Sequence, residues 1–201
     1  MLKLAKAAYQ VAEKSKVEIV IAPPQPAVAL VAKSIDIPVI CQHVDNENVG
    51  PSTGFFVPEI AKSWGAVGSL INHSEHRIET SSIASLVERM RGLGMTSIVC
   101  AREPHEVVEI AALKPDFIAI EPPELIGSGR AVSKENPAII TKSIQGAASR
   151  CSIICGAGIT DKSDVAKAIE LGSHGILVAS SIVKATSWDQ KIAELAFGMK
   201  N

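Results

Sequence analysis

The 201-residue chain has almost no net charge, few cysteines and no long uninterrupted apolar run. Lys and Arg number 20 against 21 Asp and Glu, so the net charge of −1 offers no broad basic field to a nucleic acid or an anionic membrane. The most apolar early stretch, residues 17–32, is broken by Glu18 and three prolines, and it predicts neither a membrane span nor an export signal. The expected partner is a small molecule.

The four cysteines lack the paired CxxC spacing of a metal or redox site. Each lies in or beside an apolar run, which is typical of a buried free thiol, so we expect no disulfides and a reducing, cytoplasmic setting. His43, His105 and His174 have no ligand companions at a workable spacing, and His76 is expected to face solvent or an interface. We therefore expect no metal and no cofactor. The cysteines are Cys41, Cys100, Cys151 and Cys155.

Short β-rich apolar runs alternate with amphipathic helical stretches along the chain. This pattern is typical of βα units around a parallel sheet that is buried on both faces, here in one domain over residues 1–201. The seven predicted strands are residues 17–22, 38–42, 66–71, 96–100, 116–121, 151–155 and 175–179. The predicted helices include residues 2–15, 81–93, 105–113, 137–148 and 161–171.

No strand precedes the opening helix over residues 2–15, so a closed eight-stranded barrel would lack its first strand. An open doubly wound sheet is the competing architecture. Dinucleotide-binding proteins of that kind have a Gly-rich turn after the first strand, whereas this turn reads Ala22-Pro23-Pro24-Gln25. The sequence favours a parallel β/α barrel.

Polar residues at the ends of barrel strands are candidates for chemistry, and His73 is the first of them. It follows the strand over 66–71, at the start of a predicted short helix, where the positive end of the helix disfavours an imidazolium. A neutral ring there could donate a hydrogen bond to a carbonyl as an electrophile. The alternative at this point is that His73 only caps the turn.

Glu121 ends the apolar strand over 116–121 and is followed by the segment Pro122-Pro123-Glu124-Leu125-Ile126-Gly127-Ser128-Gly129. A carboxylate at a barrel mouth loses water when a loop closes over it, which makes it a stronger base for a carbon-bound proton. Prolines at one end of the segment, glycines at the other and an apolar tip are typical of a lid that excludes water. The alternative is an ordinary βα loop with a capping glutamate.

Two late loops are rich in small residues, namely Cys155-Gly156-Ala157-Gly158-Ile159 and Ala179-Ser180-Ser181. Small residues allow backbone N–H groups to approach a phosphate closely, and the last two βα loops of such barrels commonly form a phosphate site. The pairing of these loops indicates a phosphorylated substrate.

The segments Asn72-His73-Ser74-Glu75-His76-Arg77, Glu121–Arg130 and 155–158 resemble the archaeal type of triosephosphate isomerase over essentially the whole chain. The resemblance implies an α/β fold of the TIM (β/α)8 type and interconversion of dihydroxyacetone phosphate and D-glyceraldehyde 3-phosphate. Triosephosphate isomerase is itself the standard example of a glutamate base paired with a neutral histidine, and those roles fall on Glu121 and His73.

Further roles follow only from this resemblance. Glu75 would be the acid beside the histidine, and the substrate phosphate would be held by Ile126, Gly127, Gly158, Ala179 and Ser180. The segment from Gln42 to Gly54 resembles the family's third loop, which reaches into a neighbouring subunit. A homo-oligomer, specifically a homotetramer, is therefore expected.

The sequence departs from the family at one point, because it contains no Asn-x-Lys motif to end a first strand and neutralise substrate charge. Lys3 and Lys6 lie in the opening helix and are poor substitutes. We expect roughly twenty residues, a strand with its loop, to be missing upstream of Met1. As a hypothesis, the 201-residue chain alone isomerises poorly or not at all. The alternative is a natural but catalytically crippled chain.

Two rival functions remain open from the sequence. One is a sugar-phosphate isomerase of histidine or tryptophan synthesis, which would share the late phosphate loops but lacks the segments around His73 and Glu121. The other is a noncatalytic phosphometabolite-binding barrel, motivated by the absent lysine.

Overall fold

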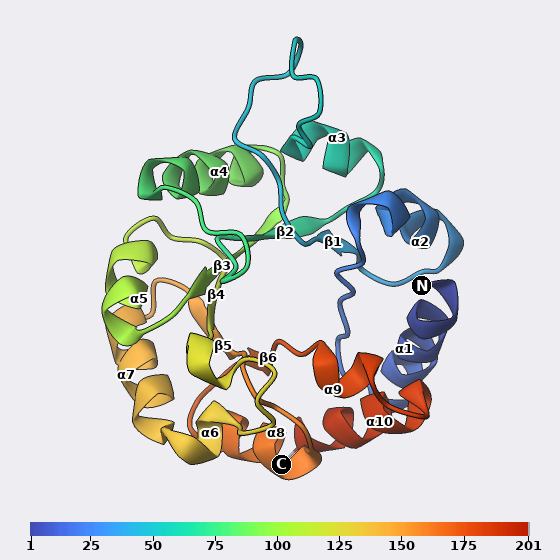
Figure 1. Cartoon of the computed structure of the whole chain (residues 1–201), viewed down its shortest axis with the longest axis vertical. Helices are drawn as coiled ribbons and strands as arrows, with labels where there is room; N and C mark the ends of the chain where they lie inside the picture. The colour runs from blue at the N-terminus through green and yellow to red at the C-terminus, as the bar shows by residue number, and fades with distance from the viewer. Residues whose placement is uncertain (201) are drawn as a thin grey trace.

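Six short parallel strands form one curved sheet in the computed structural model, which describes residues 1–200. The strands pair in chain order and a helix or loop crosses over between each pair, which confirms the predicted α/β architecture (Figure 1). They are β1 (Ile40–Cys41), β2 (Gly68–Ile71), β3 (Thr96–Ala101), β4 (Phe117–Ile120), β5 (Ser152–Cys155) and β6 (Gly175–Ile176).

The strand predicted over residues 17–22 is wrong, because this segment forms only one isolated parallel bridge, between Ile21 and Val39. Within that bridge Ile21 N–H donates to the Pro38 carbonyl, and Ile40 N–H donates to the Ile21 carbonyl. Prolines block extension of this ladder in both directions, because neither Pro23 nor Pro38 has the N–H that the next hydrogen bond needs. The described sheet therefore has six strands rather than the predicted seven.

The last strand is also shorter than predicted, ending at Ile176 rather than at residue 179. Within residues 1–200, β6 pairs only with β5, and one further hydrogen bond, from Leu177 N–H to the Cys155 carbonyl, continues beyond the strand. Because β6 and β1 do not pair with each other, the described sheet is not closed.

Alternate residues of each strand face opposite sides of the sheet, as the two-residue period of a strand requires. The outward-facing residues pack against the helices, as Val99 and Ile118 do. The inward-facing set fills the interior of the barrel and consists of Ile40, Leu70, Ile98, Cys100, Ala119 and Ile154. Apolar packing on both faces explains why the strands are almost continuously apolar.

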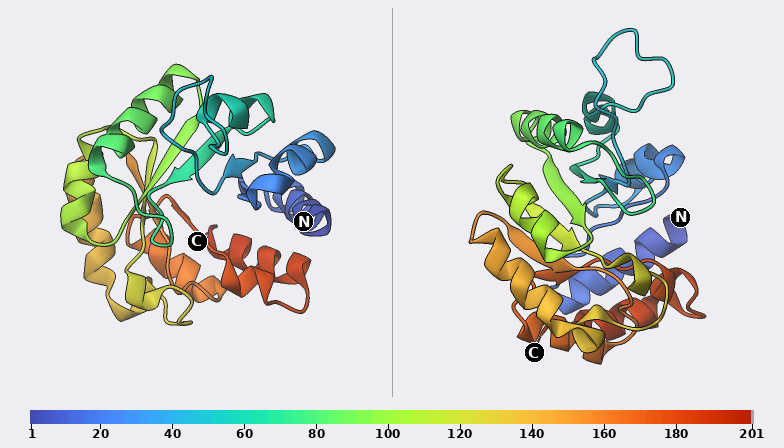
Figure 2. Two further views of the ribbon diagram at one scale, coloured as in Figure 1. Left: turned by 45° about the horizontal axis from the view of Figure 1, so that its top comes forward. Right: turned by 60° about the vertical axis from the view of Figure 1, so that its left-hand side comes forward.

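Helices surround the sheet on its outer face (Figure 1). The α1 residues Ala5, Ala8 and Val11 are buried at three-residue intervals, and α1 packs against α10, so the first and last helices lie side by side (Figure 2). The helices are α1 (Leu2–Ser15), α2 (Val28–Ser34), α3 (Pro58–Ser63), α4 (Thr80–Gly92), α5 (Pro104–Ala111), α6 (Val132–Glu135), α7 (Pro137–Ala147), α8 (Lys162–Glu170), α9 (Ser180–Val183) and α10 (Trp188–Gly198), with 3-10 turns η1 (Gln25–Ala27) and η2 (Pro123–Leu125).

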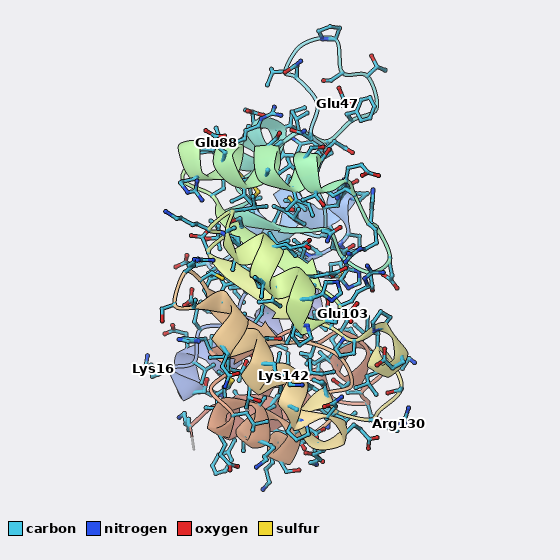
Figure 3. The ribbon with its side chains drawn as sticks, turned by 90° about the vertical axis from the view of Figure 1, so that its left-hand side faces the viewer. Lys16, Glu47, Glu88, Glu103, Arg130 and Lys142 are labelled. Atoms are coloured by element: carbon cyan, nitrogen blue, oxygen red, sulfur yellow. The ribbon has the colours of Figure 1, made fainter. Side chains whose placement is uncertain are left out.

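The two ends of the barrel carry different segments (Figure 3). Glu103, which follows β3, and Arg130, in the loop after β4, lie on one side, whereas Lys16, which precedes the Ile21 segment, lies on the other. Since all the strands run parallel, the first side is the carboxyl end of the sheet, where the βα loops and the candidate site residues gather.

Candidate active site

Glu121 is held at the carboxyl end of β4 with its side chain directed into the barrel. Its N–H donates to the Ala101 carbonyl at 2.8 Å, which continues the register between β3 and β4 by one residue. Two residues after the inward-facing Ala119, Glu121 also faces inward, and its side chain is only 7% exposed. Its Oε2 atom is buried without a hydrogen-bond partner among the described residues, which leaves one carboxylate oxygen available for chemistry.

His73 is carried by a tight loop that begins at Asn72. Asn72 has a left-handed backbone conformation, with φ 63°, and its side chain is almost fully buried. The Asn72 Nδ2 atom donates to the Cys100 carbonyl at 3.1 Å, and its Oδ1 accepts from the Ile78 N–H at 3.1 Å. These bonds stabilise a conformation that few non-glycine residues adopt and fix the start of the loop.

The imidazole of His73 faces the carboxylate of Glu121. The Glu75 N–H donates to His73 Nδ1 at 3.3 Å, which places the proton of the neutral ring on Nε2. His73 Nε2 lies 3.5 Å from Glu121 Oε2, and His73 Nδ1 lies 3.7 Å from Glu75 Oε2. Two loops from neighbouring parts of the barrel thus bring a proton donor and a proton acceptor together at its mouth.

Burial raises the pKa of the Glu121 carboxyl above its ordinary value of 4.5, and the nearby charge of Glu75 acts in the same direction. The proximity of His73 and a hydrogen bond with the Cys100 thiol act in the opposite direction and lower the pKa of Glu121. Cys100, which is inward-facing and buried, also has its own pKa raised well above 9.0 by burial and by Glu121, so it remains a thiol. A carboxylate with a raised pKa is a stronger base, as proton abstraction from carbon requires.

Gly156 leaves room for the Glu121 side chain. β4 and β5 pair in register, and Gly156, the residue after β5, lies beside Glu121. A Cβ atom added to Gly156 would lie 2.6 Å from Glu121 Oε1 and 2.8 Å from its Cδ. Within the segment predicted to bind phosphate, Gly156 therefore makes room for the Glu121 side chain.

The segment after Glu121, which is predicted to be a lid, contacts the loop after β5. Val132 N–H donates to the Ala157 carbonyl at 3.4 Å, and an added Cβ on Gly158 would collide with the Arg130 carbonyl. Gly127 and Gly158 have positive φ values of 68° and 74°. The part of this segment at Arg130 and Val132 therefore lies against the loop that carries Gly158.

The remaining residues predicted to bind the phosphate are Ile126 and, at the beginning of α9, Ala179 and Ser180. Ile126 ends the η2 turn and packs against the same apolar cluster as Val178 and Ile182, which flank Ala179 and Ser180. Ala179 immediately precedes α9 and Ser180 is its first residue. No direct contact between Ile126 and the pair Ala179 and Ser180 is described within residues 1–200.

Sequence reasoning did not anticipate the interaction between Cys100 and Glu121, each of which affects the pKa of the other. The position of Cys100 near the end of β3, the strand that pairs with the strand of Glu121, could have indicated this contact. In the described part of the chain, no three His, Cys, Asp or Glu side chains group as metal ligands do. None of the helices in residues 1–200 combines the length and the apolar character that a membrane crossing requires.

Comparison with known proteins agrees with this geometry. The sequence model of the family described as triosephosphate isomerase matches residues 2–196. Triosephosphate isomerase of Cenarchaeum symbiosum is 50% identical over 199 residues, covering 98% of this chain and 89% of that protein. Those of Caldivirga maquilingensis and Methanocaldococcus jannaschii are 45% and 40% identical, covering 97% and 96% of this chain and 88% and 90% of theirs. The chain belongs to the triosephosphate isomerase family.

Proposed function

We propose that this chain interconverts dihydroxyacetone phosphate and D-glyceraldehyde 3-phosphate, the isomerase step of glycolysis and gluconeogenesis. Family membership supports the reaction, and one observation carries the assignment of residues. In a protein of this family, the buried carboxylate of Glu121 has a free oxygen 3.5 Å from His73 Nε2. A base and a hydrogen-bond donor in this relation suit proton abstraction next to a carbonyl.

In the proposed mechanism, ionised Glu121 removes the proton from C1 of dihydroxyacetone phosphate. The electron pair of the C–H bond forms the C1–C2 double bond of an enediolate, and the negative charge develops on the C2 oxygen. The Nε2–H of His73 stabilises that oxygen, because a donor aimed at developing charge lowers the barrier. The proton of the C1 hydroxyl passes to the C2 oxygen by way of His73 Nε2, and Glu121 returns the carbon-bound proton to C2, which leaves an aldehyde at C1 and a hydroxyl at C2. Glu75 holds His73 through its N–H at Nδ1.

The substrate phosphate would be held by the lid and the two late loops, through Ile126, Gly127, Gly158, Ala179 and Ser180. Positive φ at Gly127 and Gly158 supports this proposal, because such backbone allows N–H groups to approach an anion closely. Closure of the lid would also remove water from Glu121 and strengthen it as a base.

We further place the protein in the cytoplasm as a homotetramer of the archaeal kind. The four cysteines are all free thiols, as a reducing compartment favours. The loop between β1 and α3 projects from the barrel (Figure 1). On this loop the side chains of Val49 and Phe55 are exposed, at 63% and 47%. Exposed apolar side chains on a projecting loop support contact with another subunit.

The comparisons do not favour the alternative function, a noncatalytic phosphometabolite-binding barrel, because the relatives that match nearly the whole chain are named triosephosphate isomerase. A protein of this kind would bind a phosphorylated enediolate mimic without turning over the triose phosphates.

The deciding experiment measures isomerisation by the purified chain and by its Glu121→Gln variant. We expect Glu121→Gln to lower kcat by about 10²- to 10⁴-fold, the usual contribution of a general base. Glu88→Gln is the matched control, because Glu88 is an exposed carboxylate on the outer helix α4 (Figure 3). Equal rates for the wild-type and Glu121→Gln chains, with the mimic still bound, would favour the noncatalytic function instead.

A further inference from the structure

The loop that carries His73 is tied to α5 by a chain of charged hydrogen bonds outside the site itself. The Arg77 side chain lies at the end of this loop and reaches back toward its start. Arg77 Nη1 donates to the Asn72 carbonyl at 3.4 Å, and Arg77 Nη2 donates to Glu106 Oε1 at 2.9 Å. One guanidinium therefore joins the peptide unit preceding His73 to a carboxylate on another element.

Glu106 is itself held firmly in the first turn of α5. Its side chain is 10% exposed, and its Oε2 accepts from the Arg102 N–H at 2.8 Å. Its Oε1 accepts from Arg102 Nε at 2.8 Å as well as from Arg77. Although burial opposes ionisation, hydrogen bonds from Arg102 and the charges of Arg77 and Arg102 hold the pKa of Glu106 below its ordinary value. Glu106 is thus a fixed, ionised anchor.

The Asn72 carbonyl is the point at which this anchor reaches the site. The Asn72 side chain is occupied by hydrogen bonds to the Cys100 carbonyl and the Ile78 N–H. The backbone carbonyl of Asn72 belongs to the peptide unit between Asn72 and His73, so the bond from Arg77 to this carbonyl orients that peptide unit. That peptide unit includes the N–H of His73. A change in its tilt would swing the imidazole, whose Nε2 lies 3.5 Å from Glu121.

We infer that Arg77 and Glu106 are positioning residues for His73, which keep its Nε2–H aimed at the reacting oxygen of the substrate. This inference rests on the proposed function for its catalytic consequence, but the geometry that it concerns can be measured without turnover. An ordinary structural ion pair would stabilise the fold and leave the imidazole unchanged. The positioning role predicts a change at the imidazole itself.

The test uses Arg77→Lys and Glu106→Gln in the full 201-residue chain labelled with ¹⁵N-histidine. Lysine keeps the charge but cannot donate to the Asn72 carbonyl and to Glu106 through a rigid fork, and glutamine removes the anchoring charge. We expect both variants to move the His73 nitrogen signals from those of a fixed Nε2–H tautomer toward an average of the two tautomers. In an active chain we expect kcat to fall roughly tenfold or more, with KM changing less, because small misplacements of catalytic groups are costly.

Glu59→Gln is the matched control, because Glu59 accepts an equivalent fork from Arg89 Nε and Nη2 at 2.8 and 2.6 Å, away from the His73 loop. We expect it to reduce stability and leave the His73 signals in place. Unchanged His73 signals in Arg77→Lys or in Glu106→Gln would overturn the inference. If Arg77→Lys does not fold, Arg77→Gln replaces it, and if Glu106→Gln does not fold, Glu106→Asp replaces it. The His73 nitrogen signals of the replacement are then compared with those of the wild type. A wild-type chain without isomerase activity would count against the proposed function alone, because the nitrogen signals do not depend on turnover.

Discussion

Glu121 and Gly156 occupy adjoining positions so closely that a single methyl group on Gly156 would overlap the carboxylate, at 2.6 Å from Oε1. We therefore predict that Gly156→Ala displaces the base and lowers kcat by about 100-fold, the effect of misplacing a reacting group by roughly 1 Å. Isomerase kinetics on the purified variant would measure this. Gly92→Ala is the control, since an added Cβ there meets nothing within 4 Å. Equal kcat values for Gly156→Ala and Gly92→Ala would contradict the prediction that Gly156 fixes the position of the Glu121 carboxylate.

The raised pKa of Glu121 predicts how stability depends on pH. Burial, its largest cause, makes the folded state bind this proton more tightly than the unfolded state does. The contribution of Glu121 to stability is therefore complete below about pH 4.5 and is lost as pH rises through the higher folded-state pKa. Glu121→Gln does not titrate, so its stability relative to wild type should increase over that window. Denaturant unfolding from pH 4 to pH 8 would measure the difference, and a constant difference would contradict burial as the cause.

The same shift predicts the acid limb of the rate profile. Glu121 must be ionised to take a proton, so kcat/KM should fall, as pH decreases, at a pH above that of an ordinary glutamate. Glu75→Gln removes a charge that raises the pKa and should move this limb to lower pH. A pH profile of kcat/KM for both proteins would show the displacement, and a shift of the limb to higher pH would oppose this account.

Asn72 is predicted to contribute to stability as well as to the site. Asn72→Ala loses two buried side-chain hydrogen bonds, leaves the Ile78 N–H and the Cys100 carbonyl without these partners, and retains φ 63°. We expect a loss of about 2–4 kcal/mol in the free energy of unfolding. Asn48→Ala, at an exposed loop position, should change it by less than about 0.5 kcal/mol. Urea denaturation compares the two, and similar losses would refute the special role of Asn72.

A strand ending in Asn-x-Lys, joined upstream of Met1, is predicted to raise turnover. The sequence contains no such motif, and within residues 1–200 β6 pairs with a strand on one side only. A lysine held in the active site by this added strand would neutralise the charge that develops on the substrate, as preorganised cations do. The control is the same extension with alanine in place of the lysine. It distinguishes the effect of the lysine charge on kcat from the effect of adding a strand to the sheet. If neither extension raises kcat, the noncatalytic function gains support.

Much of the fold and site was predictable because local patterns determine them. Alternation of apolar runs and helical stretches predicted the parallel sheet, and the helix over residues 2–15 was found with those bounds. The proximity of the candidates Glu121 and His73 was predictable, because each follows an apolar strand and parallel strands place such residues at one end of the barrel.

The remainder depends on contacts between distant segments. The role of Gly156 follows from the pairing register of β4 and β5, and the link from Arg77 to Glu106 joins residues 29 positions apart. Neither the register nor the side-chain rotamers are specified by local periodicity. The wrong prediction of a strand over residues 17–22 did not depend on distant contacts alone. Pro23 and Pro38, which limit this segment to one bridge, are visible in the sequence.

The most direct test of the proposed mechanism is whether Glu121 exchanges the carbon-bound proton of the substrate. Dihydroxyacetone phosphate would be incubated in deuterated water with the wild-type chain or with Glu121→Gln, and deuterium at C1 would be followed by NMR. This measurement detects proton abstraction even where complete isomerisation is slow. If Glu121 is the base, deuterium incorporation exceeds the protein-free background with the wild-type chain and returns to background with Glu121→Gln. Equal incorporation with the two folded proteins would contradict this role of Glu121.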